Sequence, residues 1–217
     1  GVPEDHEKAN IWFEKAVEDG HDQAKLNLGL NYLLGRGIDK NADKGIKLLS
    51  EAADAGVPGS NKLMAATLFY GVADYKGQAV YTNPSEALKF ARKAAAEKED
   101  GDVQFIIASV LHKTLENPED AKDWYKKAAV NGNSDAKLEL SKLYIQAGEN
   151  YEAAFQMLNE LANDKEGEAQ YYLALCYENG YGCVRDKKKA KQYYQNAAAN
   201  GYVSNDPPKK KRFSLFS

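Results

Sequence analysis

The sequence repeats itself at intervals of 33 to 42 residues, and this periodicity limits the fold more than any other feature. Six times, a run of helix-forming residues ends in a pair of small or apolar residues, and a glycine follows within seven residues. The pairs begin at Ala16, Ala52, Ala94, Ala128, Leu161 and Ala197, and the glycines are Gly20, Gly56, Gly101, Gly132, Gly167 and Gly201. Glycine closes a helix well because it takes the left-handed conformation without a Cβ penalty. The pattern predicts a helix end at each of these points.

A second pattern, Ala-x-x-x-Leu-(Gly or Ala)-x-x-Tyr, marks another helix in each repeat, which we call helix A. The clearest copies are Ala24, Leu28, Gly29, Tyr32 and Ala169, Leu173, Ala174, Tyr177. Degraded copies begin at Val103 and Ala136, and a copy from Asn61 places Ala65, Ala66 and Phe69 at the same offsets. These offsets put the residues on one helical face. The small middle residue lets a partner helix approach closely.

The partner, helix B, reads Lys-Ala-x-x-x-aromatic-x-x-Ala-Ala. Its aromatic residues include Trp12, Trp124 and Tyr194, and we expect them to pack between stacked repeats instead of binding a ligand. Neither helix can bury its apolar face alone, so neighbouring units must stack. The sequence therefore predicts an all-α fold, a right-handed α-solenoid of stacked antiparallel helix pairs with about eleven helices.

Two stretches resemble the Sel1-like repeat, a relative of the tetratricopeptide repeat. They are AKLNLGLNYLLGRGIDKNADKGIKLLSEAADAG and AQYYLALCYENGYGCVRDKKKAKQYYQNAAANG. The loops Gly35-Arg36-Gly37-Ile38 and Gly180-Tyr181-Gly182-Cys183 distinguish this family from ordinary tetratricopeptide repeats. The resemblance covers residues 1–202, which we interpret as one solenoid domain of a half repeat plus five repeats.

Some copies depart from the family pattern. The stretch GVPEDHEKANIWFEKAVEDGH matches the loop and helix B alone, so the chain opens halfway through a repeat, and Gly1 is expected to follow a removed signal or upstream domain. The copies at Val103 and Ala136 lack the Gly-x-Gly loop and look like plain tetratricopeptide units. The copy near Asn61 is followed by a longer linker over residues 71–84. This linker is either a functional loop or a tolerated surface insertion.

Composition and charge exclude several classes of protein. Hydrophobic residues make up 43% and charged residues 28%, the balance of a soluble folded protein. No stretch approaches the roughly 18 consecutive apolar residues of a membrane span, so we expect no stable membrane insertion. The net charge of −3 includes +4 from residues 209–212, which leaves −7 elsewhere. A mildly acidic body argues against nucleic acid as a partner. The compartment stays open, with export or a periplasmic location expected if an upstream signal was removed.

Side chains for catalysis or metal binding are not arranged in a recognisable pattern. None of His6, His21 and His112 has a second histidine or cysteine at ligand spacing, and the common nucleophile, phosphate and zinc motifs do not occur. Cys176 and Cys183 are too far apart for a Cys-x-x-Cys pair, and we expect two free thiols, with Cys183 in a small apolar core position. The sequence predicts no enzyme, cofactor, metal site or small-molecule substrate.

The resemblance implies a concave surface that binds a protein or peptide. By analogy with the tetratricopeptide repeat, residues of helix A beside the Leu-Gly-Tyr face line this surface. The predicted partner-binding residues are Thr67, Tyr70, Phe105, Ser109, His112, Lys142, Gln146, Tyr171 and Asn179. Leu138 and Leu175 share this register and are the likeliest of the set to pack between repeats instead.

Residues 203–217 form a separate basic tail, VSNDPPKKKRFSLFS. Its cations resemble a nuclear import signal or a patch for nucleic acid or acidic lipid. The plainer alternative is a solubilising or disordered end. The apolar residues Phe213, Leu215 and Phe216 could instead fold back to cover the last repeat.

Three functions compete. The leading one is a scaffold or adaptor for a protein partner, since relatives of this type work in signalling, protein quality control, envelope processes and host interaction. A narrower alternative is an immunity protein that neutralises a secreted effector, which a neighbouring toxin gene would favour. The third is a hydrolase, which activity on a substrate panel would favour.

Overall fold

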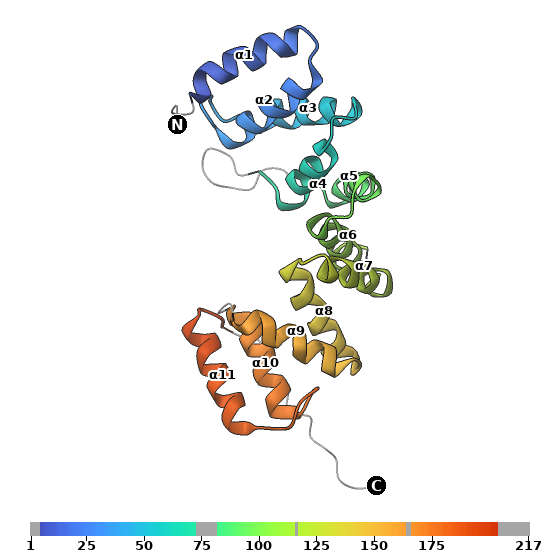
Figure 1. Cartoon of the computed structure of the whole chain (residues 1–217), viewed down its shortest axis with the longest axis vertical. Helices are drawn as coiled ribbons and strands as arrows, with labels where there is room; N and C mark the ends of the chain where they lie inside the picture. Colours follow the sequence, from blue (N-terminus) through green and yellow to red (C-terminus); the bar gives the residue numbers. More distant parts are fainter. Residues whose placement is uncertain (1–4, 73–81, 116, 164–165, 204–217) are drawn as a thin grey trace. The chain divides into compact units, whose positions relative to one another are not determined.

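The computed structural model describes residues 5–72, 82–115, 117–163 and 166–203, and every regular element in these ranges is an α-helix (Figure 1). The all-α prediction is confirmed, and the described residues form eleven helices and no strand. Most of the 71–84 linker and nearly all of the 203–217 tail lie outside the described residues. The helices are α1 (His6–Glu18), α2 (Asp22–Leu34), α3 (Ala42–Asp54), α4 (Ser60–Tyr70), α5 (Pro84–Glu97), α6 (Gly101–Lys113), α7 (Pro118–Val130), α8 (Ser134–Ala147), α9 (Tyr151–Asn163), α10 (Gly167–Asn179) and α11 (Lys187–Ala199).

The helices cluster into two compact units, divided between Asn131 and Gly132. In the first unit α1 packs on α2, and the pairs α2–α3, α4–α5 and α6–α7 follow in chain order. The second unit contains the pairs α8–α9 and α10–α11, with α9 also against α10. Helices α2, α4, α6, α8 and α10 have the A pattern and are called A helices below; the odd-numbered helices are the B helices. The predicted helix pairs are therefore confirmed.

Short polar side chains determine where many of these helices begin. The Asn41 side chain accepts a hydrogen bond from the backbone N–H of Lys44 at 3.0 Å, which satisfies a donor that has no partner inside α3. The same kind of cap is made by Asp5, Asn83, Asp100, Asn117, Asn133 and Asp186. Each such cap is typically worth about 1 kcal/mol. The helix starts are thus set locally.

Small residues allow α2 and α3 to approach closely. Gly29 on α2 and Gly45 on α3 are both buried and face each other. A Cβ added at Gly29 would lie 3.1 Å from the Gly45 carbonyl oxygen and 3.2 Å from the Leu48 side chain. The Leu-Gly-Tyr face therefore needs its small residue at the point where the helices cross.

Replacing Gly29 with leucine is expected to lower the free energy of unfolding by ~1–3 kcal/mol, the usual cost of overpacking a core. Gln23→Leu places the same side chain on an exposed position of the same helix and serves as the control. Urea unfolding followed by circular dichroism measures both variants. Equal stability of the two variants would show that the helix crossing tolerates a large side chain.

The second glycine of each Gly-x-Gly loop marks another close approach. Gly37 has a φ of 63°, and a Cβ there would lie 2.5 Å from the backbone carbonyl carbon of His6 on α1. Gly182 has a φ of 67° and would collide in the same way with the Tyr151 carbonyl of α9. In both cases the loop lies against the start of the preceding B helix. This contact explains why the loop motif has a glycine at this position.

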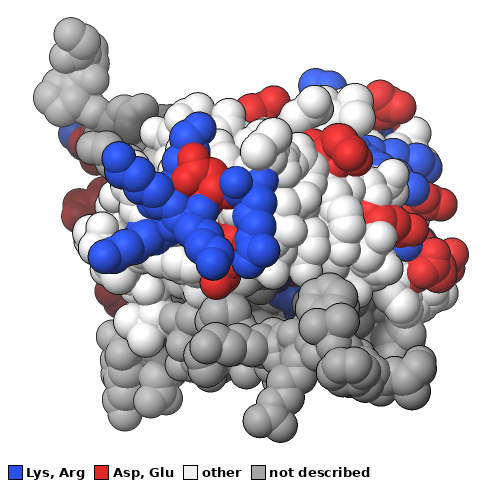
Figure 2. Space-filling view, turned by 90° about the horizontal axis from the view of Figure 1, so that it is seen from below, with Lys and Arg blue, Asp and Glu red and all other residues white. Residues whose placement is uncertain are grey.

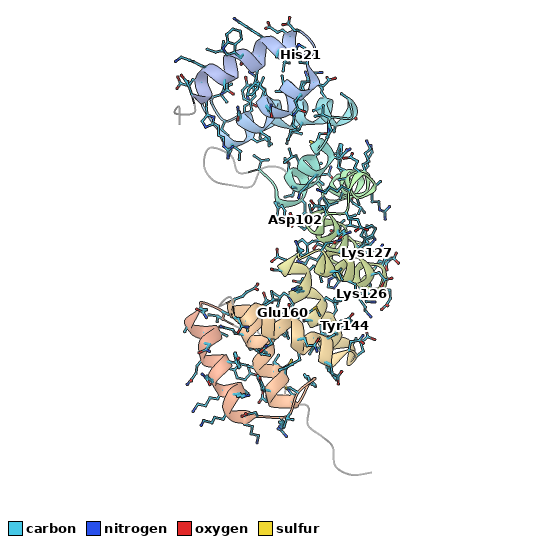
Figure 3. The ribbon with its side chains drawn as sticks, in the orientation of Figure 1. His21, Asp102, Lys126, Lys127, Tyr144 and Glu160 are labelled. Atoms are coloured by element: carbon cyan, nitrogen blue, oxygen red, sulfur yellow. The ribbon has the colours of Figure 1, made fainter. Side chains whose placement is uncertain are left out.

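A polar pair joins the start of each A helix to the end of its B helix. In α6–α7, the Asn131 amide donates to Gln104 at 2.8 Å, and Asn200 donates to Gln170 at the same distance in α10–α11. Where the A residue is lysine, the partner is a glutamate; Glu160 of one such pair is labelled in Figure 3. The five pairs are Lys25–Glu51, Asn61–Glu97, Gln104–Asn131, Lys137–Glu160 and Gln170–Asn200. Every hairpin is closed by one of these pairs, which the sequence patterns did not reveal.

The prediction that Trp12 packs between repeats is wrong. Helix α1 packs on α2 and leaves its other side to solvent, so the Trp12 side chain is 68% exposed. The Lys15 ammonium lies over its ring, 4.9 Å from the ring centre. Trp124 and Tyr194, in contrast, are half-buried.

Candidate protein-interaction surface

One backbone hydrogen bond recurs in several repeats and identifies equivalent sequence positions in their A helices. The N–H of Asn41, which caps α3, donates to the carbonyl of Tyr32 at 2.9 Å. Asn117 donates to Leu111 and Asp186 to Tyr177 in the same way. In the copy from Asn61, which is α4, Asn83 donates to Leu68. These bonds place Leu68, not Phe69, at the tyrosine position of the A pattern.

The sequence alignment of the copy from Asn61 is therefore shifted by one residue. Its buried face consists of Ser60, Met64, Ala65 and Leu68, which are at most 3% exposed. Phe69, which the sequence placed on this face, is only partly buried. The run Met64-Ala65-Ala66 offers two small residues at the crossing point, and packing selects Ala65. A shift of one residue rotates a helical position by about 100°.

The corrected alignment reveals one position that is exposed in all five A helices. It lies two residues after the tyrosine position, in the last helical turn. Its residues, which we call the A-helix end row, are Leu34, Tyr70, Lys113, Gln146 and Asn179. Leu34 is 53% and Tyr70 is 58% exposed, which is unusual for large apolar side chains. The sequence prediction included three members of this row and omitted Leu34 and Lys113.

The other predicted residues of the first unit are less accessible. Phe105 is 7% exposed, and its ring lies 6.0 Å from that of Tyr125. Ser109 is fully buried, with its hydroxyl 3.3 Å from the Tyr125 hydroxyl. Thr67 and His112 are partly buried, and the His112 ring stands edge-on to Tyr125. Phe105 and Ser109 therefore build the interior around Tyr125, and a partner cannot reach them without repacking α6.

In the second unit, Gln146 and Asn179 are exposed, whereas Tyr171 packs within its own hairpin. The Tyr171 ring lies 5.4 Å from Tyr194 and 5.2 Å from Tyr202. The Tyr194 hydroxyl donates to Glu178 at 2.8 Å, which fixes this aromatic group. Part of the Tyr171 side chain remains accessible at the edge of the group.

Lys142 lies in a charged cluster that the sequence did not indicate. Its ammonium is 2.9 Å from Glu139 and 3.0 Å from Glu168, and lies over the Tyr172 ring at 5.8 Å. Burial by itself lowers the pKa of Lys142, but the hydrogen bonds to the two glutamates outweigh it and raise the pKa. Lys142 therefore stays charged, and its hydrogen bonds link α8 to α10. A spacing rule could not find this cluster because Glu168 comes from the next repeat.

A shallow groove of about 400 Å³ lies between α1 and α2 in the first unit. Its lining combines apolar Phe13 and Leu30 with polar Asn27 and Arg36. Asn31, also in the lining, donates to buried Asn10 at 2.7 Å, and Asn10 donates to the Arg36 carbonyl at 2.8 Å. This network holds one wall of the groove in place.

Within the described ranges, no three histidine, cysteine or acidic side chains come together as metal ligands. Cys176 is buried and Cys183 half-buried, both as free thiols, and burial raises the pKa of Cys176 to about 12. A thiol with so high a pKa is a poor nucleophile at neutral pH. None of the described helices is both long and apolar enough to cross a bilayer.

Repeated helical hairpins with an Ala-Leu-Gly-Tyr face define a tetratricopeptide-like helical-repeat protein. The sequence model of the Sel1 repeat matches residues 1–21, 22–57, 65–98, 113–133 and 167–202. The chain belongs to the Sel1-repeat family.

Similar proteins agree with this assignment. A solved structure of c5321, a protective antigen of uropathogenic Escherichia coli with an SLR fold, is 26% identical, with a TM-score of 0.74 over 91% of this chain and 42% of that one. A Sel1 repeat protein from Oxalobacter formigenes is 25% identical, with a TM-score of 0.66 over 90% of this chain and 83% of that one. The chitin synthase regulator SKT5 of Saccharomyces cerevisiae is 29% identical over 92% of this chain, which spans only 30% of SKT5.

Proposed function

We propose that this chain is a non-enzymatic scaffold that binds a protein partner through the first-unit members of the A-helix end row, Leu34, Tyr70 and Lys113. One observation carries the proposal: the same position stays exposed in all five A helices while its residue changes from leucine to tyrosine, lysine, glutamine and asparagine. The fold does not dictate the side chain at this position. We therefore attribute the differences in residue type at this position to contacts with a partner.

The apolar part of the row lies in the first unit, and we expect it to contribute most of the affinity. Leu34 and Tyr70 are both more than half exposed, and Leu115, just beyond α6, is 51% exposed. Large apolar and aromatic side chains of this kind commonly dominate protein interfaces. The similar protein SKT5 is a chitin synthase regulator, and regulation of an enzyme is a role that supports protein binding by this chain.

The competing functions have weaker support. An immunity protein would be a special case of the proposal, with a secreted effector as the partner. A hydrolase needs a nucleophile with an activating group, and the common nucleophile motifs do not occur in the sequence. The scaffold function therefore accounts for the observed surface with the fewest additional assumptions.

The experiment begins with a photo-crosslinking amino acid at position 34 or 70, which captures the partner from cells of the source organism. The partner is then purified, and its affinity is measured by calorimetry for Leu34→Ala and Tyr70→Ala. We expect each substitution to weaken binding by about 2 kcal/mol, or roughly 30-fold, as at an interface hot spot. Both side chains are exposed, so the melting temperature should change little.

Val130→Ala is the matched control, because Val130 is 87% exposed but belongs to B helix α7. It should bind the partner like the parent chain. Parental affinity of both row variants, or equal loss in the Val130 variant, would place the interface on another surface.

A further inference from the structure

Exposed cations gather at the start of α11. Arg185, Lys187, Lys188, Lys189 and Lys191 are all exposed and lie within seven residues that contain one carboxylate, Asp186. We call these five cations the α11 basic patch. Figure 2 looks onto this end of the second unit and shows lysine and arginine side chains gathered on one face. The whole chain has a net charge of −3, so the patch opposes the overall charge.

The patch is not neutralised by neighbouring acids. Asp186 is occupied as the helix cap, accepting from the backbone N–H groups of Lys188 and Lys189 at 2.9 and 3.0 Å. Lys187, Lys188 and Lys191 form no ion pair with any residue in the described ranges. Elsewhere, lysines such as Lys25 and Lys62 pair with aspartates at 2.9 and 2.6 Å. The α11 basic patch thus presents positive charge to solvent.

Helix stability does not explain this arrangement. The N-terminal end of a helix has a partial positive charge, so acidic residues stabilise the first turn and lysines oppose it. Nine of the eleven described helices have an acidic residue in the first turn, whereas α11 has three lysines there. These lysines therefore lower the stability of the first turn of α11. Binding of an anionic partner would explain why they are present.

We propose that the α11 basic patch binds the surface of a membrane that contains anionic lipids. Val184, next to the patch, is 88% exposed and could enter the headgroup region while the lysines contact lipid phosphates. Four of the five cations are lysines, which attract a charged surface without the bidentate geometry that arginine offers to single phosphates.

A nucleic acid fits this surface less well. Bases of a single strand stack on exposed aromatic rings. The nearby rings are already occupied, since Tyr193 stacks on Tyr177 and Tyr194 packs on Tyr171. The Lys189 ammonium lies over the Tyr177 ring, 5.1 Å from its centre. An acidic protein segment also fits less well, because its charges make no use of the exposed Val184 side chain. Such a segment would need an apolar residue beside its charges to contact Val184.

The test is co-sedimentation of the full chain with vesicles of phosphatidylcholine and phosphatidylserine, and with vesicles of phosphatidylcholine alone. The parent chain should bind only the anionic vesicles and should dissociate as salt rises from about 0.1 to about 1 M, since the Debye length falls from about 10 to about 3 Å. Each lysine near such a surface contributes about fivefold in partitioning. The triple variant Lys187→Gln, Lys188→Gln, Lys191→Gln should therefore bind about a hundredfold more weakly.

The control removes three exposed cations from α5, with Lys89→Gln, Arg92→Gln and Lys93→Gln. It changes the net charge equally and should retain parental binding. A further variant, Lys187→Glu with Lys188→Glu, should melt no lower than the parent because it adds acids to the first turn, and yet should lose vesicle binding. This result separates recognition from folding.

Four outcomes would overturn the proposal. They are equal binding of the parent to both kinds of vesicle, equal loss in the α5 control, undiminished binding by the α11 triple variant, and preferential binding of the parent to RNA or polyglutamate over anionic vesicles. Replacing the cations at 209–212 of the tail with glutamine should leave at least part of the binding in place. Complete loss in that variant would be a fifth such outcome, since it would assign membrane binding to the tail instead.

Discussion

Replacing Gly182 with alanine should lower the free energy of unfolding of the second unit by about 2–5 kcal/mol. Two costs combine. Alanine in the left-handed conformation, required by the φ of 67°, costs about 1–2 kcal/mol. Its Cβ would also collide with the Tyr151 carbonyl and lie 2.8 Å from the Glu152 Cα, an overpacking that costs about 1–3 kcal/mol. Both neighbours are backbone atoms, so no side chain can rotate away.

Gly201→Ala separates the two costs. Gly201 has a φ of 82°, but a Cβ there would meet nothing within 4 Å. This variant should therefore lose only the conformational part, about 1–2 kcal/mol. Urea unfolding of both variants measures the difference. If the two variants lose the same stability, the loop does not need its glycine for the contact with α9.

Leu173→Ala is expected to destabilise the second unit by about 2–5 kcal/mol, the range for a buried leucine that leaves a cavity. Leu173 is fully buried in a cluster with Leu138, Leu158 and Leu161. Cys176 lies in the same cluster and serves as a reporter, since burial and a pKa raised to about 12 protect its thiol in the folded state.

The rate at which a thiol reagent labels Cys176 at neutral pH reports how often this core opens. Mass spectrometry distinguishes the labelling of Cys176 from that of Cys183. Labelling of Cys176 should accelerate at least about 30-fold in the Leu173 variant, because each 1.4 kcal/mol changes the open population tenfold. Leu175→Ala, on a half-buried position of the same helix, should accelerate it much less. Equal acceleration in the two variants would contradict the assignment of Leu173 to the core.

Periodicity alone predicted the helix pairs and most of their buried faces. Ala24 and Leu28 in the first A helix, and Ala169 and Leu173 in the last, recur at offsets that only one helical face satisfies, and all four are buried. Helix starts were equally local, because a cap such as Asn41 contacts a backbone group three residues away. Family membership followed from the same signals, since the loop glycines and the helix faces lie within one repeat.

The candidate site was less predictable because exposure depends on neighbours outside the repeat. In α6, ten of thirteen residues are buried, since the helix contacts α4, α5 and α7. Phe105 and Ser109 are therefore interior, although their offsets match those of partly exposed Tyr171 and Lys142 in other repeats. Residues at the same offset in different A helices therefore have different exposure, because the A helices differ in the number of helices packed against them.

By itself, then, the sequence determined the helices, their pairing and their family, because each depends on residues a few positions apart. Tertiary structure decided the alignment of the α4–α5 repeat, where either Ala65 or Ala66 could be the small residue at the helix crossing and packing against α5 buries Ala65. It also decided which polar residues close each hairpin, such as Gln104 with Asn131. These partners lie about thirty residues apart, and they meet only when the two helices have packed.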